Sequence, residues 1–263
     1  MVAVFLLLFV AVLGTGCRPG KQADIRIAGS TSVQPLSEEL ADAFMKKNPG
    51  ITVIVAGGGS SAGIKAAHEG TADIGASSRE LTPEEKKGLT ETVIAKDAIA
   101  IIVNPKNSVS QLSLAQIRGI FAGEITNWKD VGGKDAPIHL FTREEGSGTR
   151  GAFEEIVMGK GKRITGKASV QNSTGAIRTA VEWDESAIGY ISLGCVNERV
   201  KVVAVDGVKP SRETVLRGTY KLWRPFIYLT KGEPTGAAKK FIDFVLSEEG
   251  QRIVGEMFVP VKR

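Results

Sequence analysis

The sequence predicts an α/β protein, because short apolar runs that read as strands alternate with amphipathic helical segments from residue 24 onward. The 263 residues are enough for one large domain or for two lobes, each with its own core. One run, AIAIIV at residues 98–103, is uninterrupted, which is typical of a strand buried on both faces. We therefore predict a parallel or mixed sheet flanked by helices.

The first half of the chain alternates strand and helix signals. The segment 33–48 places Leu36, Leu40 and Phe44 on one helical face, and Pro49-Gly50 ends it. In the same way a short helix is expected at residues 61–69, and Pro83 marks another helix start. The strands expected in this half are residues 24–29, 51–55, 72–76 and 98–103.

The second half continues the alternation, without a repeat of fixed period. The helix expected at residues 237–246 carries Phe241, Ile242 and Val245 on one face. The other helices expected here are residues 114–122, 148–157, 174–182 and 248–254. The expected strands are residues 138–142, 188–192 and 226–229.

The N-terminal apolar run, residues 2–13, is shorter than the ~20 residues that span a bilayer and has the length of a signal-peptide core. We expect a signal peptide at residues 1–16 and a lipid-anchored linker at 17–23, ahead of the folded domain at 24–263. Cys17 resembles the acylated cysteine of bacterial lipoproteins, and an unmodified cysteine is the alternative. The expected location is periplasmic or at the cell surface, with a membrane tether. Cys195 is expected to be a small buried hydrophobe.

The composition excludes several classes of protein. Hydrophobic residues are 42% and charged residues 24%, a globular balance that argues against disorder. The net charge of +5 is scattered along the chain and aromatic residues are only 6%, so a nucleic-acid partner is not expected. His and Cys, two residues of each, are too sparse for a zinc cluster, and no metal or other cofactor is expected.

Polar loops rich in Gly, Ser and Thr recur where strands end and helices begin. Loops at the carboxyl ends of parallel strands share one rim of a sheet, where ligands bind. A helix N-terminus presents unpaired N–H groups, and glycine lets the backbone approach a ligand closely. Ser and Thr are also ordinary N-caps, so one such loop is weak evidence, whereas several together predict a site for a small oxyanion. The loops are residues 29–32, 57–61, 75–79, 143–149 and 172–175.

An enzyme is the competing interpretation, with Ser147 as the nucleophile of an exported hydrolase. Such a serine needs a base, and the two histidines, His68 and His139, lie in segments that read as a surface helix and a strand. The sequence EGSGT is not the Gly-x-Ser-x-Gly elbow, and there is no P-loop. A binding protein needs only donors, so we predict binding without catalysis.

The chain resembles a known family over nearly all of its length after the N-terminal linker. The matching stretches are IAGSTSVQPL, GGGSSAGI, ADIGASSREL, IRGIFAGEITNW, TREEGSGTR, AIGYISLG, LWRPFIYL and FIDFVLSEEGQ. They resemble the PstS family, the phosphate-binding proteins of bacterial phosphate ABC transporters. The resemblance implies the two-lobe type II periplasmic-binding-protein fold, a ligand cleft between the lobes, and a monomer that delivers inorganic phosphate to a permease. The alternative is a binder of another oxyanion, sulfate or molybdate.

The resemblance also implies where the lobes join. The crossing strands are expected near residues 102–104 and 224–227. Lobe 1 would comprise residues 24–102 and 226–263, and lobe 2 residues 103–225.

Residue by residue, the resemblance assigns ligand contacts to loops of both lobes. The binding residues it implies are Thr31, Ser32, Ser60, Ser78, Arg143, Ser147, Gly148 and Thr149, with Asn172 and Ser173 lining the cleft less directly.

One position departs from the family, because better-known members carry an aspartate, which accepts a proton from phosphate, where this chain has Ser78. Glu144, Glu145 or a backbone carbonyl could replace it, and Glu145 could instead hold Arg143 in place. Arg79 is the alternative anchor for the anion. We expect phosphate to bind more tightly than sulfate, with one of the two glutamates as the proton acceptor, since a buried like-charge contact costs several kcal/mol.

Overall fold

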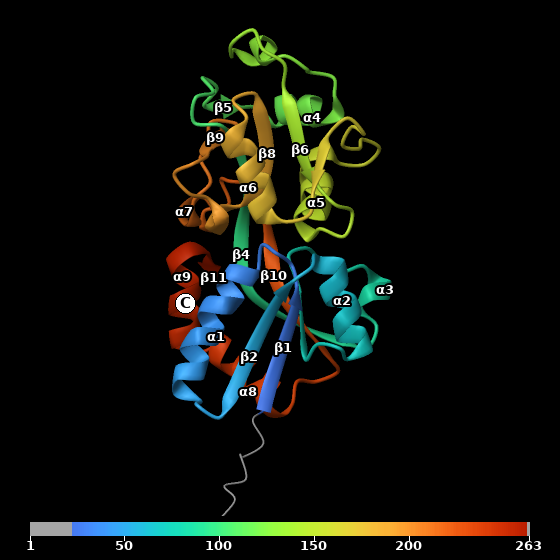
Figure 1. Cartoon of the computed structure of the whole chain (residues 1–263), viewed down its shortest axis with the longest axis vertical. Coiled ribbons are helices and arrows are strands. Elements are labelled where there is room, and N and C mark those ends of the chain that lie inside the picture. Colours follow the sequence, from blue (N-terminus) through green and yellow to red (C-terminus); the bar gives the residue numbers. More distant parts are fainter. Residues whose placement is uncertain (1–22, 262–263) are drawn as a thin grey trace, which may run out of the picture.

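The computed structural model describes residues 23–261, which form two halves stacked end to end (Figure 1). We call the half that contains the start of the described chain lobe 1 and the other half lobe 2. Mixed sheets flanked by helices run through both, so the predicted α/β fold class is confirmed. The predicted signal peptide and Cys17 lie outside the described residues.

Lobe 1 is built on a sheet with helices on both faces. Strand β1 pairs in parallel with β2 and β3, and β10 pairs antiparallel with β3. Side chains alternate along β10: Phe226 and Tyr228 join the core under α1, α8 and α9, while Ile227 and Leu229 join the core under α2. The elements are β1 (Ala23–Gly29), α1 (Gln34–Lys47), β2 (Ile51–Gly57), α2 (Ser60–Glu69), β3 (Ile74–Ser77), α3 (Pro83–Lys86), α8 (Gly236–Val245), α9 (Glu248–Met257) and β11 (Val259–Pro260).

Lobe 2 has its own sheet and core. Strand β6 pairs in parallel with β7 and β8. Phe153 stacks on Tyr190 with ring centroids 4.0 Å apart, and Phe121 packs edge-on against Phe153. The elements are β5 (Gln111–Leu112), α4 (Leu114–Ala122), η1 (Trp128–Val131), β6 (His139–Arg143), α5 (Gly148–Phe153), the π-helical turn η2 (Glu154–Met158), β7 (Ser169–Gln171), α6 (Thr174–Trp183), β8 (Ala187–Ser192), η3 (Leu193–Cys195), β9 (Lys201–Val205) and α7 (Arg212–Leu216).

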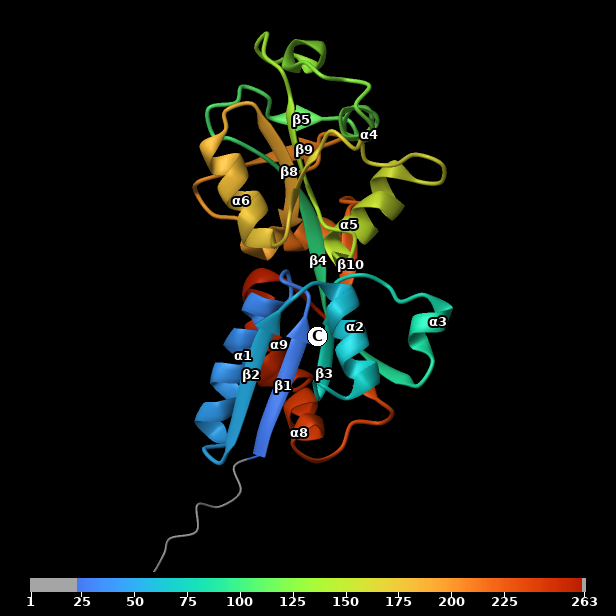
Figure 2. The same cartoon turned by 45° about the vertical axis from the view of Figure 1, so that its right-hand side comes forward.

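Two strands, β4 (Leu89–Val103) and β10 (Trp223–Lys231), pass from one lobe to the other (Figure 2). Strand β4 pairs with β10 as far as Ala98 and with β8 from Ile99 onward, so its partners change between these two residues. This change lies four residues before the predicted lobe boundary at residue 102. The sequence showed only residues 98–103 as a strand, because the earlier part of β4 carries polar, partly exposed side chains.

A buried ion pair ties the two crossing strands together. Arg224 donates from Nε and Nη2 to Asp97 Oδ2 at 3.2 and 3.0 Å, and Ser192 of β8 donates to Asp97 Oδ1 at 2.9 Å. Both charged side chains are fully buried, and Arg224 Nη1 has no hydrogen-bond partner. Burial raises the pKa of Asp97 to about 6, although Arg224 and Ser192 favour its ionised form.

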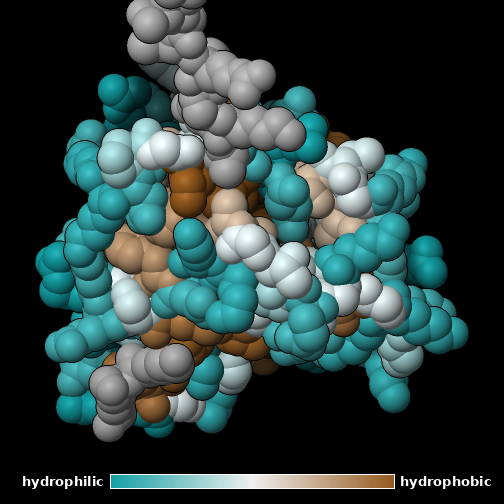
Figure 3. All heavy atoms as spheres, turned by 90° about the horizontal axis from the view of Figure 1, so that it is seen from below, coloured by the Kyte–Doolittle hydropathy of each residue, from teal (hydrophilic) through white to brown (hydrophobic). Residues whose placement is uncertain are grey.

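Most of the predicted elements agree with the structure within a few residues, and α4 agrees at both ends. The helix predicted at residues 148–157 consists of α5 and the π-helical turn η2. The sequence did not indicate β5, β7, β9, β11 or α7, all short segments of two to five residues. Among the described residues no helix is both long and apolar enough to cross a membrane. The end of lobe 1 has hydrophilic side chains around its rim and hydrophobic ones toward the middle (Figure 3).

Candidate functional site

Four helices point their N-terminal ends at the boundary between the lobes, α1 and α2 from lobe 1 and α5 and α6 from lobe 2 (Figures 1 and 2). The loops before these helices touch each other across the boundary. Ser61 donates its backbone N–H to the carbonyl oxygen of Gly146 at 3.0 Å, and Thr174 donates its N–H to Thr31 Oγ1 at 3.2 Å. The strand ends therefore bring the polar loops of both lobes together.

Hydroxyl groups from both lobes form a buried cluster between these helices. Ser32 Oγ lies 2.8 Å from Thr149 Oγ1 and 3.0 Å from Thr174 Oγ1, and Thr31 Oγ1 lies 3.2 Å from Thr174 Oγ1. Ser32, Thr149 and Thr174 are each at most 2% exposed. Because a hydroxyl can donate or accept, such a cluster can redirect its hydrogens toward an anion.

A second group of serines continues the cluster on the side of lobe 1. Ser78 accepts from Ser30 Oγ at 2.8 Å, and its backbone N–H donates to Ser60 Oγ at 3.0 Å. Gly148 of lobe 2 fits against them, since a Cβ at this glycine would lie 2.2 Å from Ser60 Oγ and 2.7 Å from Ser78 Oγ. Only glycine permits this approach of the two lobes. We call the set of Ser30, Thr31, Ser32, Ser60, Ser78, Thr149 and Thr174 the hydroxyl cluster.

One guanidinium group is buried beside the hydroxyl cluster. Arg143, at the end of β6, donates from Nε and Nη2 to the two carboxylate oxygens of Glu144 at 2.9 and 2.8 Å. Its Nη1 points the other way and donates to Thr174 Oγ1 at 3.1 Å. The Arg143 side chain is 2% exposed and that of Glu144 is 29% exposed. Glu144 thus fixes the arginine from the solvent side and leaves Nη1 among the hydroxyls.

The other candidates from the sequence lie around or outside the cluster. Ser147 and Ser173 accept backbone N–H bonds as the N-caps of α5 and α6. Glu145 and Asn172 are exposed. Glu144 rather than Glu145 makes the ion pair with Arg143.

Arg79, the alternative anchor, is bonded to residues outside the hydroxyl cluster, and its Nη2 donates to Ser61 Oγ at 3.3 Å. It makes two bonds of 2.7 Å to the carboxylate of Glu85. These bonds lower the pKa of Glu85 to about 2, against the opposing effect of its partial burial. With its guanidinium held by Glu85, Arg79 lies outside the hydroxyl cluster.

Two members of the hydroxyl cluster, Ser30 and Thr174, were not among the predicted site residues. Both belong to loops that the sequence singled out, but each stands next to a residue that was preferred, Thr31 in one loop and Ser173 in the other. Which of two adjacent hydroxyls points inward depends on the turn geometry before the helix. No composition or spacing signal reports that geometry.

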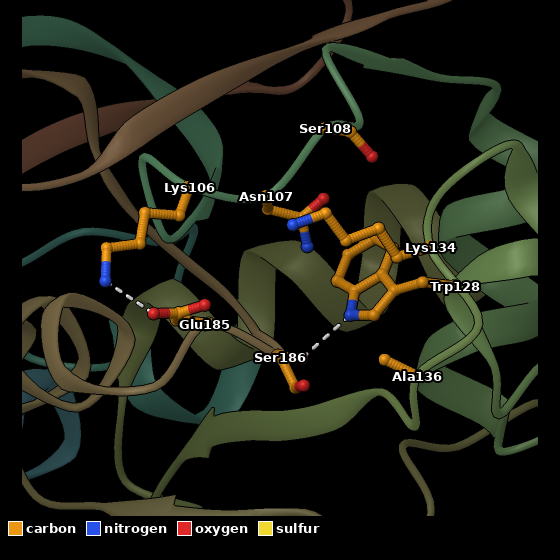
Figure 4. Close-up of a pocket in the computed structure, with 8 residues that line it drawn as sticks. All are labelled: Lys106, Asn107, Ser108, Trp128, Lys134, Ala136, Glu185 and Ser186. Atoms are coloured by element: carbon orange, nitrogen blue, oxygen red, sulfur yellow. Dashed lines mark hydrogen bonds and ion pairs between the residues drawn. The ribbon is translucent and has the colours of Figure 1, made fainter.

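Two hollows on the surface of the described residues lie away from the hydroxyl cluster. A cavity of about 90 Å³ in lobe 2 lies beside the buried Trp128, whose Nε1 donates to the carbonyl of Ser186, and beside the Lys106–Glu185 ion pair (Figure 4). A wider hollow is lined by Glu145 and the basic segment at residues 160–163. Neither contains a buried charged side chain.

Little in the described residues favours other chemistry. They contain no cluster of three His, Cys, Asp or Glu side chains that could hold a metal ion. Cys195 is buried, as predicted, and burial raises its pKa to about 11. His68 Nε2 is bonded to the carbonyl of Glu85, and His139 Nδ1 is bonded to Asp184, so each histidine ring has a hydrogen-bond partner other than Ser147.

A family model and a known protein both match most of this chain. The family model of the PBP superfamily domain matches residues 18–249. The phosphate-binding protein PstS of Bacillus subtilis (strain 168) is 33% identical over 245 residues, which cover 90% of this chain and 80% of that protein.

Two solved structures resemble this chain in both fold and sequence. A Clostridium perfringens protein assigned as a phosphate ABC transporter substrate-binding protein, with bound phosphate, aligns with a TM-score of 0.88 and 48% identity over 91% of this chain and all of that one. An ABC-type phosphate transport receptor from Vibrio cholerae aligns with a TM-score of 0.74 and 38% identity over 90% of this chain and all of that one.

Proposed function

The chain belongs to the PBP superfamily and, within it, to the PstS phosphate-binding proteins, and from this premise we propose that it captures inorganic phosphate between its lobes for an ABC transporter. It acts outside the cytoplasm and passes the anion to the permease subunits. The relatives are binding proteins of transporters. In this proposal the chain likewise binds its ligand for a transporter and does not catalyse a reaction.

The observation that carries the proposal is the buried Arg143 at the edge of a hydroxyl cluster drawn from both lobes. A buried guanidinium whose Nη1 is bonded to a neutral hydroxyl attracts an anion strongly, because hydrogen bonds between charged groups are stronger than those to neutral partners. Its carboxylate partner, Glu144, approaches from the solvent side and leaves Nη1 among the hydroxyls. Phosphate offers oxygens to all of these donors at once, so its binding would hold the lobes together.

The same arrangement explains how phosphate binding changes the conformation that a permease meets. Ser32 and Ser60 belong to lobe 1, whereas Arg143 and Thr149 belong to lobe 2. An anion bonded to both sets favours the lobe arrangement in which they meet, and only that differential contact can shift the equilibrium between conformations. The crossing strands β4 and β10 are where the lobes would turn.

Calorimetry tests the proposal with the purified protein, freed of bound anion by partial unfolding and refolding. Phosphate should bind with one site per chain and more tightly than molybdate or sulfate. Tighter binding of sulfate or molybdate would favour the second candidate function, a binder of another oxyanion. The absence of any phosphate binding would reject the function itself.

The binding interpretation also predicts no turnover of phosphate or acyl esters. Ser147 Oγ accepts a hydrogen bond from the backbone N–H of Arg150 and serves as a helix cap. An ester hydrolysis that disappears specifically in Ser147→Ala would revive the hydrolase alternative.

We further propose that Cys17 is acylated and tethers the protein to the membrane, as the sequence before it suggests. In a detergent phase separation the full-length protein should enter the detergent phase, and Cys17→Ser should enter the aqueous phase with its phosphate affinity unchanged. Full-length protein with a free Cys17 thiol in the aqueous phase would contradict this.

A further inference from the structure

The cavity beside Trp128 lies in lobe 2, between the loop that follows β4, the segment 128–136 and the turn from α6 to β8 (Figure 4). Its volume of about 90 Å³ equals the share of roughly three water molecules in the liquid, ~30 Å³ each. A molecule of roughly four or five non-hydrogen atoms fits such a space. The lining of this cavity contains no member of the hydroxyl cluster, so it is a separate place in the fold.

One buried side chain, Asn107, presents an unused donor to this cavity. It is 9% exposed, and its Oδ1 accepts the backbone N–H of Val109 at 2.9 Å, which fixes the orientation of the amide. Its Nδ2 donates to no atom of the described residues. Among these residues Arg224 Nη1 is the one enclosed side-chain nitrogen without a partner, so Asn107 Nδ2 is in contact with the cavity and is not sealed within the protein.

The cavity is also lined by more cations than anions. Lys106 Nζ lies 2.6 Å from Glu185 Oε1, and this hydrogen bond, with a smaller effect from the charge of Lys134, holds the pKa of Glu185 below its usual range. Among the described residues Lys134 forms no ion pair, whereas Lys129 of the same segment is paired with Asp135. Two ammonium groups thus share one carboxylate, which leaves one positive charge at the cavity without a counter-charge.

The wall between these polar groups is apolar. The indole of Trp128 is 2% exposed, and its Nε1 donates to the carbonyl oxygen of Ser186 at 2.9 Å, so its single N–H is used. The ring and the methyl group of Ala136 line the cavity, and the side chain of Lys134 extends across the ring toward Asn107 (Figure 4). A ligand in this space meets an apolar wall on one side and amide and ammonium donors on the other.

We propose that this cavity is a second ligand site of the protein, which binds a short-chain carboxylate of the size of acetate or propionate. The carboxylate accepts from Lys134 Nζ and Asn107 Nδ2, and the alkyl end lies against Trp128. The uncompensated positive charge favours an anion, because charge-assisted hydrogen bonds are the stronger kind. Inorganic phosphate is disfavoured here, since some of its oxygens would face the indole ring, and an oxygen buried without a hydrogen bond costs free energy.

The site lies at the far end of α6 (Thr174–Trp183) from the hydroxyl cluster. Thr174, at the start of this helix, belongs to the cluster, and Glu185 follows the end of the helix. Ten residues that rise about 1.5 Å each place the two ends about 15 Å apart. Because this exceeds the ~8 Å over which salt screens exposed charges, changes at the cavity should leave phosphate affinity unchanged. The proposal goes beyond phosphate capture and does not depend on it.

Nuclear magnetic resonance of the purified, isotope-labelled protein tests the site, with propionate as the probe at constant pH and ionic strength. Propionate should produce saturable shifts of the side-chain amide of Asn107 and of the indole N–H of Trp128, with a dissociation constant on the order of 1 mM for a ligand of about five atoms. Propionamide, which has the same shape without the charge, should bind about tenfold more weakly. Saturating phosphate should leave the binding of propionate unchanged.

The matched variants are Lys134→Ala and Lys129→Ala. Both lysines are exposed and lie in the same segment, but Lys129 is paired with Asp135 and does not line the cavity. Lys134→Ala should weaken propionate binding about fivefold, the effect of about 1 kcal/mol for an exposed charge, and Lys129→Ala should leave it unchanged. Asn107→Asp keeps the oxygen that accepts from Val109 and replaces the donor with a carboxylate oxygen, so propionate binding should be lost.

Shifts that do not saturate, or that sodium chloride reproduces at the same ionic strength, would overturn the proposal. Equal effects of the two lysine variants, or propionamide that binds as tightly as propionate, would do the same. Phosphate that displaces propionate from the cavity would contradict the class of ligand. If Asn107→Asp does not fold, the two lysine variants and propionamide decide. Each of these results leaves the proposed phosphate function standing, since calorimetry measures that function separately.

Discussion

Two arginines of this protein are buried beside a carboxylate, yet their surroundings differ. Arg224 on the crossing strands faces Asp97 and Ser192, both fully buried, and its Nη1 has no hydrogen-bond partner. Arg143 is held by Glu144, which is partly exposed, and it reaches into a cluster of hydroxyls from both lobes. A buried charge is therefore not by itself a sign of a ligand site. The distinguishing feature is the set of uncharged donors around it, which only Arg143 has.

The largest effect expected from this comparison concerns stability at the crossing strands. Asp97→Ala removes both the counter-charge and the hydrogen-bond acceptors that the buried Arg224 and Ser192 use, and should lower the free energy of unfolding by about 3–5 kcal/mol, measured by urea denaturation. The double change Asp97→Leu with Arg224→Met should recover most of the loss, because it leaves no buried charge unpaired. A loss of less than about 1 kcal/mol in the single variant would show that the pair is not a structural unit.

Arg143→Ala should act on binding. Each hydrogen bond to a charged group contributes roughly 1.5–3 kcal/mol, so phosphate affinity should fall at least ~10-fold in calorimetry. Arg143→Lys should recover only part, because an ammonium group cannot reproduce the planar fork. The matched control is Arg79→Ala, whose guanidinium is occupied by Glu85. Equal losses in the two alanine variants would remove the distinction between the arginines.

Asp97 also predicts a pH dependence of stability. Its pKa is about 6 in the folded protein, raised by burial, against about 3.9 in unfolded chains. The folded state therefore holds the proton more tightly, and this contribution to stability is present below about pH 4 and is lost as the pH rises through about 6. Between these values the free energy of unfolding should fall by about 2 kcal/mol relative to Asp97→Asn. A difference that grows with pH in this window would contradict the assignment.

The smallest effect is expected at Glu144, which positions Arg143 without facing the anion in this account. Glu144→Gln keeps the shape of the side chain and removes the charge that holds the guanidinium. Phosphate and sulfate affinities should fall together, by about fivefold, the effect of about 1 kcal/mol. If sulfate affinity rises while phosphate affinity falls, Glu144 accepts the proton of phosphate and does not act only by positioning Arg143.

The sequence predicted most of the fold because its long elements carry strong periodic signals. The helix α4 shows this well, since its apolar face and its Ser113 capping box are both local features. The long strand β4 could not be outlined in the same way, because its first part is stabilised by pairing with β10, more than 120 residues away. Partners at that distance leave no trace in local composition.

The meeting of the polar loops between the lobes was predictable from the sequence, whereas the directions of their side chains were not. Thr31, Ser32, Ser60, Ser78, Arg143, Gly148 and Thr149 do meet between the lobes. The sequence did not single out Ser30 and Thr174, and it favoured Glu145 over Glu144 as the partner of Arg143. In each case two adjacent residues have similar side chains, and only the direction in which each side chain points tells them apart. That direction is set by the tertiary turn, which the sequence alone does not specify.

The most direct test of the central claim is a crystal structure of the protein with bound phosphate. The account predicts one anion between the lobes, within hydrogen-bond distance of Arg143 Nη1 and of hydroxyls from both lobes, including those of Ser32 and Thr149. An anion bound elsewhere, such as in the hollow beside residues 160–163, with the bonds of Arg143 unchanged, would contradict it.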